Sequence, residues 1–154
     1  MSSISITPVA HVIHGRRDPI DDHWAHEIST IELVPEFSPD ALLGLDAFSH
    51  IEIIFHFHLV LDHTIERVAR YPRNNPAYPK VGIFAQRGKN RPNCLGVSIA
   101  RLVKIEGRQL TLAGLDAIEG TPILDIKPVF GEFLPKDEIR QPDWSRDLMK
   151  SYWE

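Results

Sequence analysis

Short apolar segments rich in β-branched side chains follow one another along most of the chain, and this pattern limits the possible folds more than any other feature. Glycine, proline, aspartate or asparagine separates the segments, as expected for strands joined by turns. They comprise residues 4–13, 28–34, 50–61, 80–85, 96–105, 109–115 and 123–128. The sequence therefore predicts a mainly β fold, a single-sheet antiparallel β-barrel.

Alternation within these segments supports strands that expose only one face. In residues 109–115 the larger apolar side chains fall at Leu110 and Leu112, and then one residue out of phase at Leu115. Just before them, residues 105–109 have the composition of a tight turn in an antiparallel hairpin. We expect two consecutive strands to pair here.

Helical signals are few. Ser38 is a candidate N-cap followed by Pro39, and the helix that they predict ends at Gly44. A second short helix is predicted over residues 143–152, with apolar side chains spaced along one side. At 154 residues, without a linker-like stretch or an internal repeat, the chain is expected to form one domain, residues 1–154.

Charge and cysteine content limit the classes of protein to which this chain can belong. The formal net charge is −4, yet residues 51–130 carry 11 basic and 7 acidic side chains, so the middle of the chain is basic. The single cysteine, Cys94, cannot form an internal disulfide. No signal-peptide pattern occurs, and no stretch approaches the ~18 uncharged residues of a membrane span. We expect a cytoplasmic protein without a membrane partner.

Residues 82–93 form the densest group of chemically active side chains. Arg87, Lys89 and Arg91 lie between glycines and a proline, directly after an apolar strand. Glycine lets a backbone approach a ligand closely, and the guanidinium fork suits a carboxylate or a phosphate. The pattern indicates an anion-binding loop, although an ordinary solvated turn has the same composition.

Histidines line one face of the segment at residues 50–58. His50, His56 and His58 alternate with apolar side chains on the opposite face. His56 and His58, together with His50 or His63, are candidate metal ligands. A strand that faces a polar groove would show the same spacing, and no established metal motif is present.

Residues 115–128 combine a strand end, a turn and a further strand that carries acidic side chains. Asp116 could accept hydrogen bonds from a ribose or an amino group, while Asp125 and Lys127 share one strand face. A simple turn and a surface ion pair explain the same residues. No glycine fingerprint of a Rossmann or P-loop nucleotide site is present.

In this order, three blocks resemble the TrmO family, also called TsaA-like or YaeB-like proteins. The blocks read GLDAFSH at 44–50, GIFAQR at 82–87 with RPN at 91–93, and LD at 115–116 with GTP at 120–122 and DIKP at 125–128. The resemblance implies a β-barrel that forms a homodimer and binds S-adenosyl-L-methionine. It also implies N6-methylation of threonylcarbamoyladenosine next to the tRNA anticodon.

The resemblance also assigns site residues. Cofactor contacts would come from Phe57, His58, Leu59, Arg87, Val97, Ala113, Gly114, Leu115 and Asp116. The family's N-terminal elements are missing here, and Asp22, His23 and Trp24 are the candidates to replace their cofactor contact. Substrate contacts would come from Arg91, Asn93 and Lys127, and the general base would be His58 or Asp116. Arg87 would hold the cofactor carboxylate, and backbone groups at residues 114–116 would contact the adenine edge. No metal is assigned.

The sequence departs from the family pattern in places. Gln86 and Gly88 flank Arg87 where members often have Thr and Ser, and residues 14–24 replace the family's N-terminal elements. The chain ends soon after the predicted barrel, so we expect a short form without the C-terminal domain of the bacterial tRNA enzymes. Two alternatives stay open: a non-catalytic regulatory barrel that binds S-adenosyl-L-methionine, and a metalloenzyme that uses histidine ligands.

Overall fold

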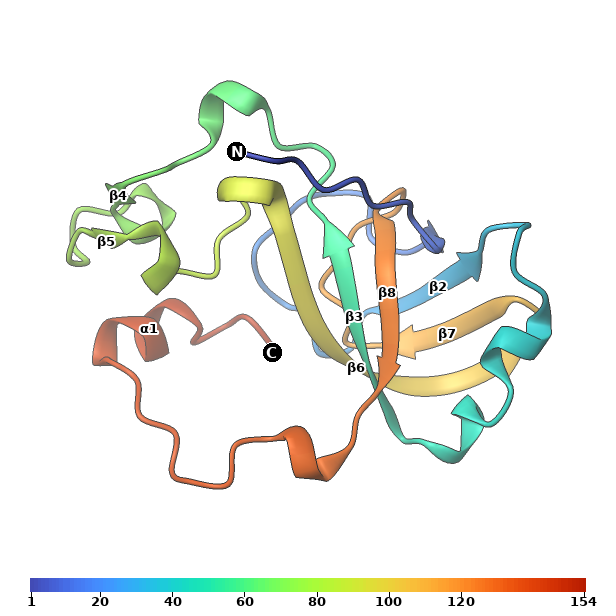
Figure 1. Cartoon of the computed structure of the whole chain (residues 1–154). Helices are drawn as coiled ribbons and strands as arrows, with labels where there is room; N and C mark the ends of the chain where they lie inside the picture. The colour runs from blue at the N-terminus through green and yellow to red at the C-terminus, as the bar shows by residue number, and fades with distance from the viewer.

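Six strands close into an antiparallel barrel in the order β1-β2-β7-β6-β3-β8 (Figure 1). The structure, a computed structural model, describes all residues from 1 to 154. Every pair of neighbouring strands in the barrel is antiparallel. The strands are β1 Ala10–His14, β2 Ile28–Leu33, β3 His50–His56, β6 Leu95–Glu106, β7 Gln109–Ala113 and β8 Pro122–Pro128. The predicted mainly β barrel is confirmed.

The barrel interior is filled by alternate side chains of the strands. On β3, Ile51, Ile53 and Phe55 are buried, whereas the intervening residues are exposed or half-buried, as the histidine-lined segment predicted. Gly96 on β6 faces this row, and a Cβ added to it would lie 2.5 Å from the Phe55 ring. The close approach of ring and backbone explains why glycine occupies a strand interior here.

The predicted hairpin is present between β6 and β7. Glu106 pairs with Gln109, which leaves a two-residue loop of Gly107 and Arg108. Gly107 has a φ of +59°, a left-handed conformation that glycine adopts without steric cost. This turn sets the register that places Leu110 and Leu112 in the core.

Several segments are shorter than predicted. The first strand begins only at Ala10, and residues 4–7 are exposed. The third ends at His56 instead of continuing to residue 61. Residues 80–85 contribute only the two-residue β5, Val81–Gly82, which pairs with β4, Ala69–Arg70, because a 3-10 turn follows immediately.

The helices also differ from expectation. Ser38 caps a 3-10 helix as predicted, with its Oγ accepting from Asp40 N at 3.2 Å. The helix α1 covers only Asp143–Leu148. Residues 149–152 leave the helix. The 3-10 helices are η1 Pro39–Leu42, η2 Leu45–Ala47, η3 Asp62–Thr64, η4 Pro72–Asn74, η5 Ile83–Ala85, η6 Pro92–Cys94 and η7 Gly131–Phe133.

The C-terminal segment returns to the barrel after β8. Figure 1 shows it passing through η7, a long loop and α1, so that the chain ends between α1 and β6. His23 N donates to Ser151 O at 3.0 Å, and Trp24 N donates to Tyr152 O at 2.9 Å. These bonds fix the last residues against the loop before β2. No helix is both long and apolar enough to cross a membrane.

Candidate functional site

The loop before β2, the end of β7 and the C-terminal segment meet at one place outside the barrel wall. Besides the two main-chain bonds to His23 and Trp24, the Tyr152 hydroxyl donates a hydrogen bond to Asp116 Oδ2. Predicted site residues from two distant stretches, 22–24 and 113–116, are therefore joined through the C-terminal segment.

Asp116 reaches this position because of the residue two places before it. Gly114 has a φ of +81°, and its N–H donates to Glu27 O at 2.9 Å. The left-handed conformation shifts the alternation of β7, so that Leu115 turns into the core and is fully buried. A contact of the Leu115 backbone with the adenine edge remains a prediction.

Only one of the two carboxylate oxygens of Asp116 has a hydrogen-bond donor. Oδ2 accepts the bond from Tyr152, whereas Oδ1 is buried and has no hydrogen-bond donor in the chain. Burial and, secondarily, the charge of Asp116 raise the pKa of Tyr152 well above its ordinary value, so the hydroxyl remains a donor. A buried carboxylate oxygen without a donor is costly, and a ligand amino or hydroxyl group would satisfy it.

The predicted contacts at residues 22–24 are largely occupied by protein groups. Arg73 binds the Asp22 carboxylate, with Nη2 to Oδ1 at 2.8 Å. Arg16 lies 3.7 Å above the Trp24 ring centroid and donates to the carbonyls of Asp22 and His23 at 2.8 and 2.6 Å. In this conformation residues 22–24 support the site through contacts with other protein groups. Their direct contact with a cofactor remains a prediction.

A groove opens beside the end of β7. It has a volume of about 360 Å³. Its walls combine apolar, cationic and backbone groups, from Ala25, His50, Ile99, Arg101, Ala113, Gly114 and Trp153. Ala113 and Gly114 are predicted cofactor residues. Trp153, whose ring packs edge-on against Tyr152 at a centroid distance of 5.0 Å, adds an aromatic wall.

Arg87 and Val97 are linked to each other. The exposed Arg87 guanidinium donates from Nη2 to Val97 O at 3.2 Å, and Val97 is exposed on the outer side of β6, two residues from Ile99 in the groove. The charge of Arg87 lowers the pKa of Tyr152, although burial outweighs it. Arg87 therefore acts electrostatically on Tyr152, the hydrogen-bond partner of Asp116.

The residues that follow β3 have different surroundings. Phe57 packs edge-on against Phe55 with centroids 5.2 Å apart, and Leu59 is exposed. His58 lies against Gly120, where an added Cβ would be 3.4 Å from its Nε2. Burial first, then the charges of His56 and His11, lowers the pKa of His58. No contact links these residues to Asp116.

The three predicted substrate residues are also dispersed. Arg91 Nη1 donates to Gln86 O at 2.6 Å within its own loop, and Asn93 has a left-handed φ of +66°. Lys127 forms an exposed ion pair with Asp125 at 2.6 Å, and this pair raises its pKa. The structure places Lys127 on the outer side of β8, opposite Glu52 of β3.

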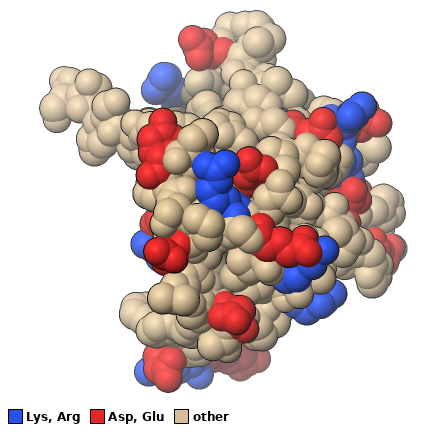
Figure 2. Space-filling view, turned by 90° about the vertical axis from the view of Figure 1, so that its right-hand side faces the viewer, with Lys and Arg blue, Asp and Glu red and all other residues tan.

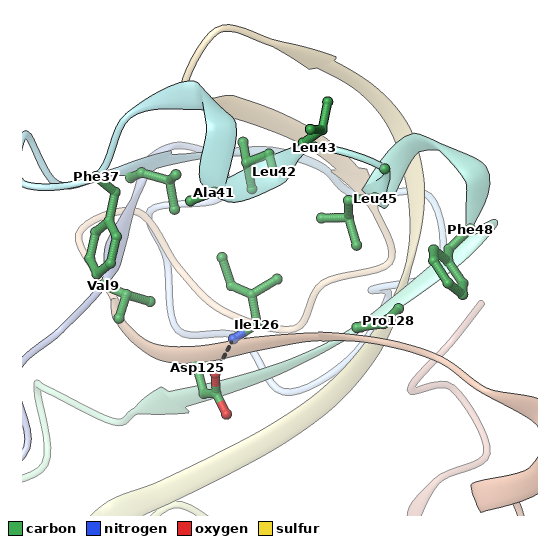
Figure 3. A pocket seen from close by; sticks show the side chains of 12 residues that line it. Val9, Phe37, Ala41, Leu42, Leu43, Leu45, Phe48, Asp125, Ile126 and Pro128 are labelled. Carbon is green, nitrogen blue, oxygen red and sulfur yellow. Dashed lines mark hydrogen bonds between the residues drawn. The ribbon is translucent and has the colours of Figure 1, made fainter.

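Neither the predicted histidine metal site nor the other hollow of the molecule adds groups to this candidate site. No three histidine, cysteine or acidic side chains lie close enough to hold a metal ion, so the histidine-metal alternative lacks a ligand set. A larger hollow of about 540 Å³ lies at one barrel end, where Leu42, Phe48 and Ile126 line it (Figure 3). Asp125 at its edge bonds the N–H of Ile126 at 2.9 Å, and no predicted site residue borders this hollow.

Tyr152 and Trp153 were not predicted as site residues. Their sequence places Tyr152 on the apolar side of an expected helix, and a helical pattern gives no sign of a bond to a residue 36 positions earlier. Only the pairing of residues 151–152 with residues 23–24 brings both aromatic side chains to the end of β7. No local signal in the sequence would have identified them.

Comparison with known proteins identifies relatives over most of the chain. The tRNA (adenine(37)-N6)-methyltransferase of Homo sapiens is 41% identical over 108 residues, which are 70% of this chain and 23% of that protein. A probable S-adenosyl-L-methionine-binding protein of Methanothermobacter thermautotrophicus is 36% identical, over 73% of this chain and 77% of that protein.

A solved structure shares the fold. The crystal structure of TrmO superposes with a TM-score of 0.75 at 30% identity, covering 91% of this chain and 64% of that one. This chain thus spans less than a quarter of the human relative and under two thirds of the solved TrmO chain. Residues 14–133 match the family described as the tRNA-methyltransferase O N-terminal domain, and the chain belongs to that family.

Proposed function

We propose that this chain binds S-adenosyl-L-methionine at the groove beside Asp116 and transfers the methyl group to N6 of an adenosine next to the anticodon of tRNA. Three observations support the proposal: the C-terminal segment joins residues 23–24 to Asp116, Ala113 and Gly114 line the groove, and the charge of Arg87 acts on Tyr152. Relatives named tRNA (adenine(37)-N6)-methyltransferase in Homo sapiens and Escherichia coli are 41% and 38% identical.

The groups around the groove fit such a cofactor. Asp116 Oδ1 needs a hydrogen-bond donor, which an amino group or a ribose hydroxyl would supply. The exposed Arg87 guanidinium suits a carboxylate, and Ile99 and Trp153 offer apolar surface for a planar base. These groups would bind the carboxylate, the base and either the amino group or the ribose of the cofactor.

The cofactor would supply a methyl group that is already activated for displacement, so the protein needs no covalent nucleophile. The chain's residues would align the reactants, exclude water and accept the proton that leaves N6. Asp116, two residues beyond Gly114 of the groove, is one candidate base, and its buried Oδ1 has no hydrogen-bond donor. His58, with its lowered pKa, is the candidate that is neutral at physiological pH.

We also propose a homodimer formed through the outer side of β6. Leu95, Val97, Ile99 and Val103 lie along this strand, interrupted by Arg101, and each residue is between 38% and 44% exposed. Because Ile99 and Arg101 also line the groove, the interface would border the cofactor site. A row of apolar side chains on a sheet face is typical of a protein interface. Replacing Val103 by glutamate should shift the sedimentation of the protein from dimer to monomer, with Glu106→Gln as a neutral control.

Transfer to tRNA can be tested directly. The protein is incubated with methyl-labelled S-adenosyl-L-methionine and with tRNA from a strain that lacks this modification, and the nucleosides are then identified by mass spectrometry. We expect the label on N6 of a modified adenosine, and we place the protein with its substrate in the cytoplasm. Cofactor binding without any labelled nucleoside would overturn the tRNA assignment.

A second function is favoured by one relative. The Methanothermobacter protein, of which this chain covers 77%, carries the name of a binding protein and not of an enzyme. A non-catalytic barrel that responds to S-adenosyl-L-methionine would gain thermal stability with the cofactor, because a ligand that binds only the folded state stabilises it. It would transfer no methyl group to bulk tRNA.

A further inference from the structure

The chain between β3 and β6 leaves the barrel and forms a separate arm around the β4–β5 pair. Figure 1 shows this segment projecting to the left of the barrel, next to α1. We call residues 62–94 the basic arm, because they carry seven lysines and arginines but only two acidic side chains. The cations are Arg67, Arg70, Arg73, Lys80, Arg87, Lys89 and Arg91.

Some of these cations have structural partners within the chain, and others have none. Arg73 binds Asp22, Arg91 donates to a carbonyl of its own loop, and Arg70 Nη2 donates to Asn74 Oδ1 at 2.9 Å. The remaining group, apart from the proposed cofactor ligand Arg87, makes no ion pair or side-chain hydrogen bond. It consists of Arg67, Lys80 and Lys89.

The acidic residues of the basic arm do not cancel this charge. Glu66 accepts hydrogen bonds at Oε1 from the N–H groups of Val68 and Arg67, at 2.7 and 2.9 Å. The bond from Val68 is the main cause of its lowered pKa, and the charges of Arg70 and Lys80 add to it. Glu66 stays ionised, but with Asp62 it is one of only two acids against seven cations, so the arm keeps a net positive charge.

Side-chain bonds hold the basic arm in a defined shape. Gln86 Nε2 donates to the carbonyls of Arg70 and Val81 at 3.1 and 3.0 Å. These bonds hold the segment around Gln86 to both strands of the β4–β5 pair. Asn90 Nδ2 donates to Thr64 Oγ1 at 2.7 Å. A preformed surface of this kind loses less conformational entropy on binding than a mobile loop.

The basic arm also carries an exposed aromatic ring. Within η5, Ile83 is buried, whereas Phe84 is 80% exposed. One exposed ring is ordinary in a soluble protein, but a ring among unpaired cations matches the way proteins bind single-stranded RNA. In that mode the cations contact phosphates and the ring stacks on a base that is not paired.

The face of the molecule seen from the right-hand side of Figure 1 lacks this character. On the face shown in Figure 2, basic and acidic side chains are interspersed and no large patch has a single sign. The basic arm also adjoins the proposed cofactor groove, because Arg87 of the arm bonds the Val97 carbonyl and Arg73 bonds Asp22. An RNA held by the arm would lie next to the groove.

We propose that the basic arm binds an RNA loop, with Lys80 and Lys89 on phosphates and Phe84 stacked on an unpaired base. The inference rests on the proposed function, which supplies a tRNA anticodon loop as the RNA, while the contacts follow from the arm itself. Arg67 adds a further cation at the start of β4.

The test measures binding of the chain, residues 1–154, to a labelled, unmodified anticodon stem-loop RNA by fluorescence anisotropy over a range of salt concentrations. We expect the double variant Lys80→Gln/Lys89→Gln to bind several-fold more weakly and to reduce the slope of log K against log salt by about 1 for each lysine. Phe84→Ala should weaken binding about 5- to 100-fold without changing the slope, because one base stack is lost.

Two matched controls and a second ligand make the result specific. Phe133 is 86% exposed on η7, so Phe133→Ala removes an equally exposed ring, and Lys104→Gln/Lys136→Gln removes two exposed lysines outside the arm. Both controls should bind as the wild type. A fully paired RNA duplex should lose affinity with the lysine variant but not with Phe84→Ala. Circular dichroism and melting temperature verify folding.

The outcomes separate this inference from the proposed function. Equal losses of RNA affinity in the arm and control variants would contradict the proposed RNA-binding surface. So would a wild type that binds phosphatidylserine vesicles but not RNA. Calorimetry with S-adenosyl-L-methionine tests the groove independently. If the wild type binds no cofactor while the arm variants still lose RNA affinity, the proposed methyl transfer fails and the RNA surface stands.

Discussion

The hydroxyl of Tyr152 donates a hydrogen bond to Asp116, which joins the C-terminal segment to a residue three positions beyond the end of β7. Asp116 Oδ1 has no donor of its own, so this bond is the only hydrogen bond that the carboxylate side chain receives. The proposed cofactor groove and the last turn of the chain therefore depend on each other.

Replacing Tyr152 by phenylalanine should destabilise the fold. The variant keeps the ring but leaves both oxygens of Asp116 without a donor, and an unsatisfied buried acceptor costs about 1–3 kcal/mol. Urea denaturation followed by tryptophan fluorescence would measure the change in the free energy of unfolding. Tyr78→Phe is the control, because its bond to Asp147 at 2.7 Å is exposed and should contribute under about 1 kcal/mol. An equal loss in both variants would contradict this account.

Much of the barrel could be predicted from the alternation of apolar and polar side chains. Where the prediction was wrong, the cause is local. The buried row of Ile51, Ile53 and Phe55 followed directly from the pattern. Leu115, in contrast, is out of phase because Gly114 adopts a left-handed φ, which no alternation rule anticipates. Residues 80–85 are apolar enough for a strand, yet the 3-10 turn at Ile83 ends the pairing after two residues.

The site was less predictable because it depends on contacts between distant segments. The resemblance to a family pointed to Asp116 and Arg87, but their direct use of a cofactor remains a prediction. Asp22 was expected to contact a ligand, whereas in the structure its carboxylate binds Arg73, 51 positions away. Tyr152 required the fold of the C-terminal segment, since its helix ends at Leu148.

Gly96→Ala should disturb the core where Gly88→Ala does not. A Cβ at residue 96 would lie 2.5 Å from atoms of the Phe55 ring, which is itself buried, so the ring or the strand must move. Overpacking of this kind costs about 1–3 kcal/mol. At Gly88 no atom lies within 4 Å of an added Cβ, so thermal denaturation should show almost no change. A stable Gly96→Ala protein would show that the barrel relaxes at this point.

Arg87→Ala should weaken the binding of S-adenosyl-L-methionine. A charge-assisted hydrogen bond to a carboxylate contributes about 1.5–3 kcal/mol, which corresponds to roughly 10- to 150-fold in Kd. Isothermal titration calorimetry would measure it, with Arg108→Ala in the β6–β7 hairpin as a control for the loss of a cation. Unchanged affinity in Arg87→Ala would place the carboxylate of the cofactor elsewhere.

His58→Gln should reveal whether a histidine accepts the proton from N6. Burial and the neighbouring charges of His56 and His11 lower the pKa of His58 below 6.5, so the imidazole is neutral, and able to accept a proton, throughout the physiological range. If it is the base, kcat of the wild type is constant above about pH 6.5 and falls as the pH drops through the lowered pKa. His58→Gln should then have a much smaller kcat and no decline on the acidic side.

His56→Gln, which removes one of the charges that lower this pKa, should move the decline towards higher pH while keeping most of the activity. If His58→Gln keeps full activity and Asp116→Asn loses it, the base is Asp116, the candidate whose free oxygen lies beside the groove.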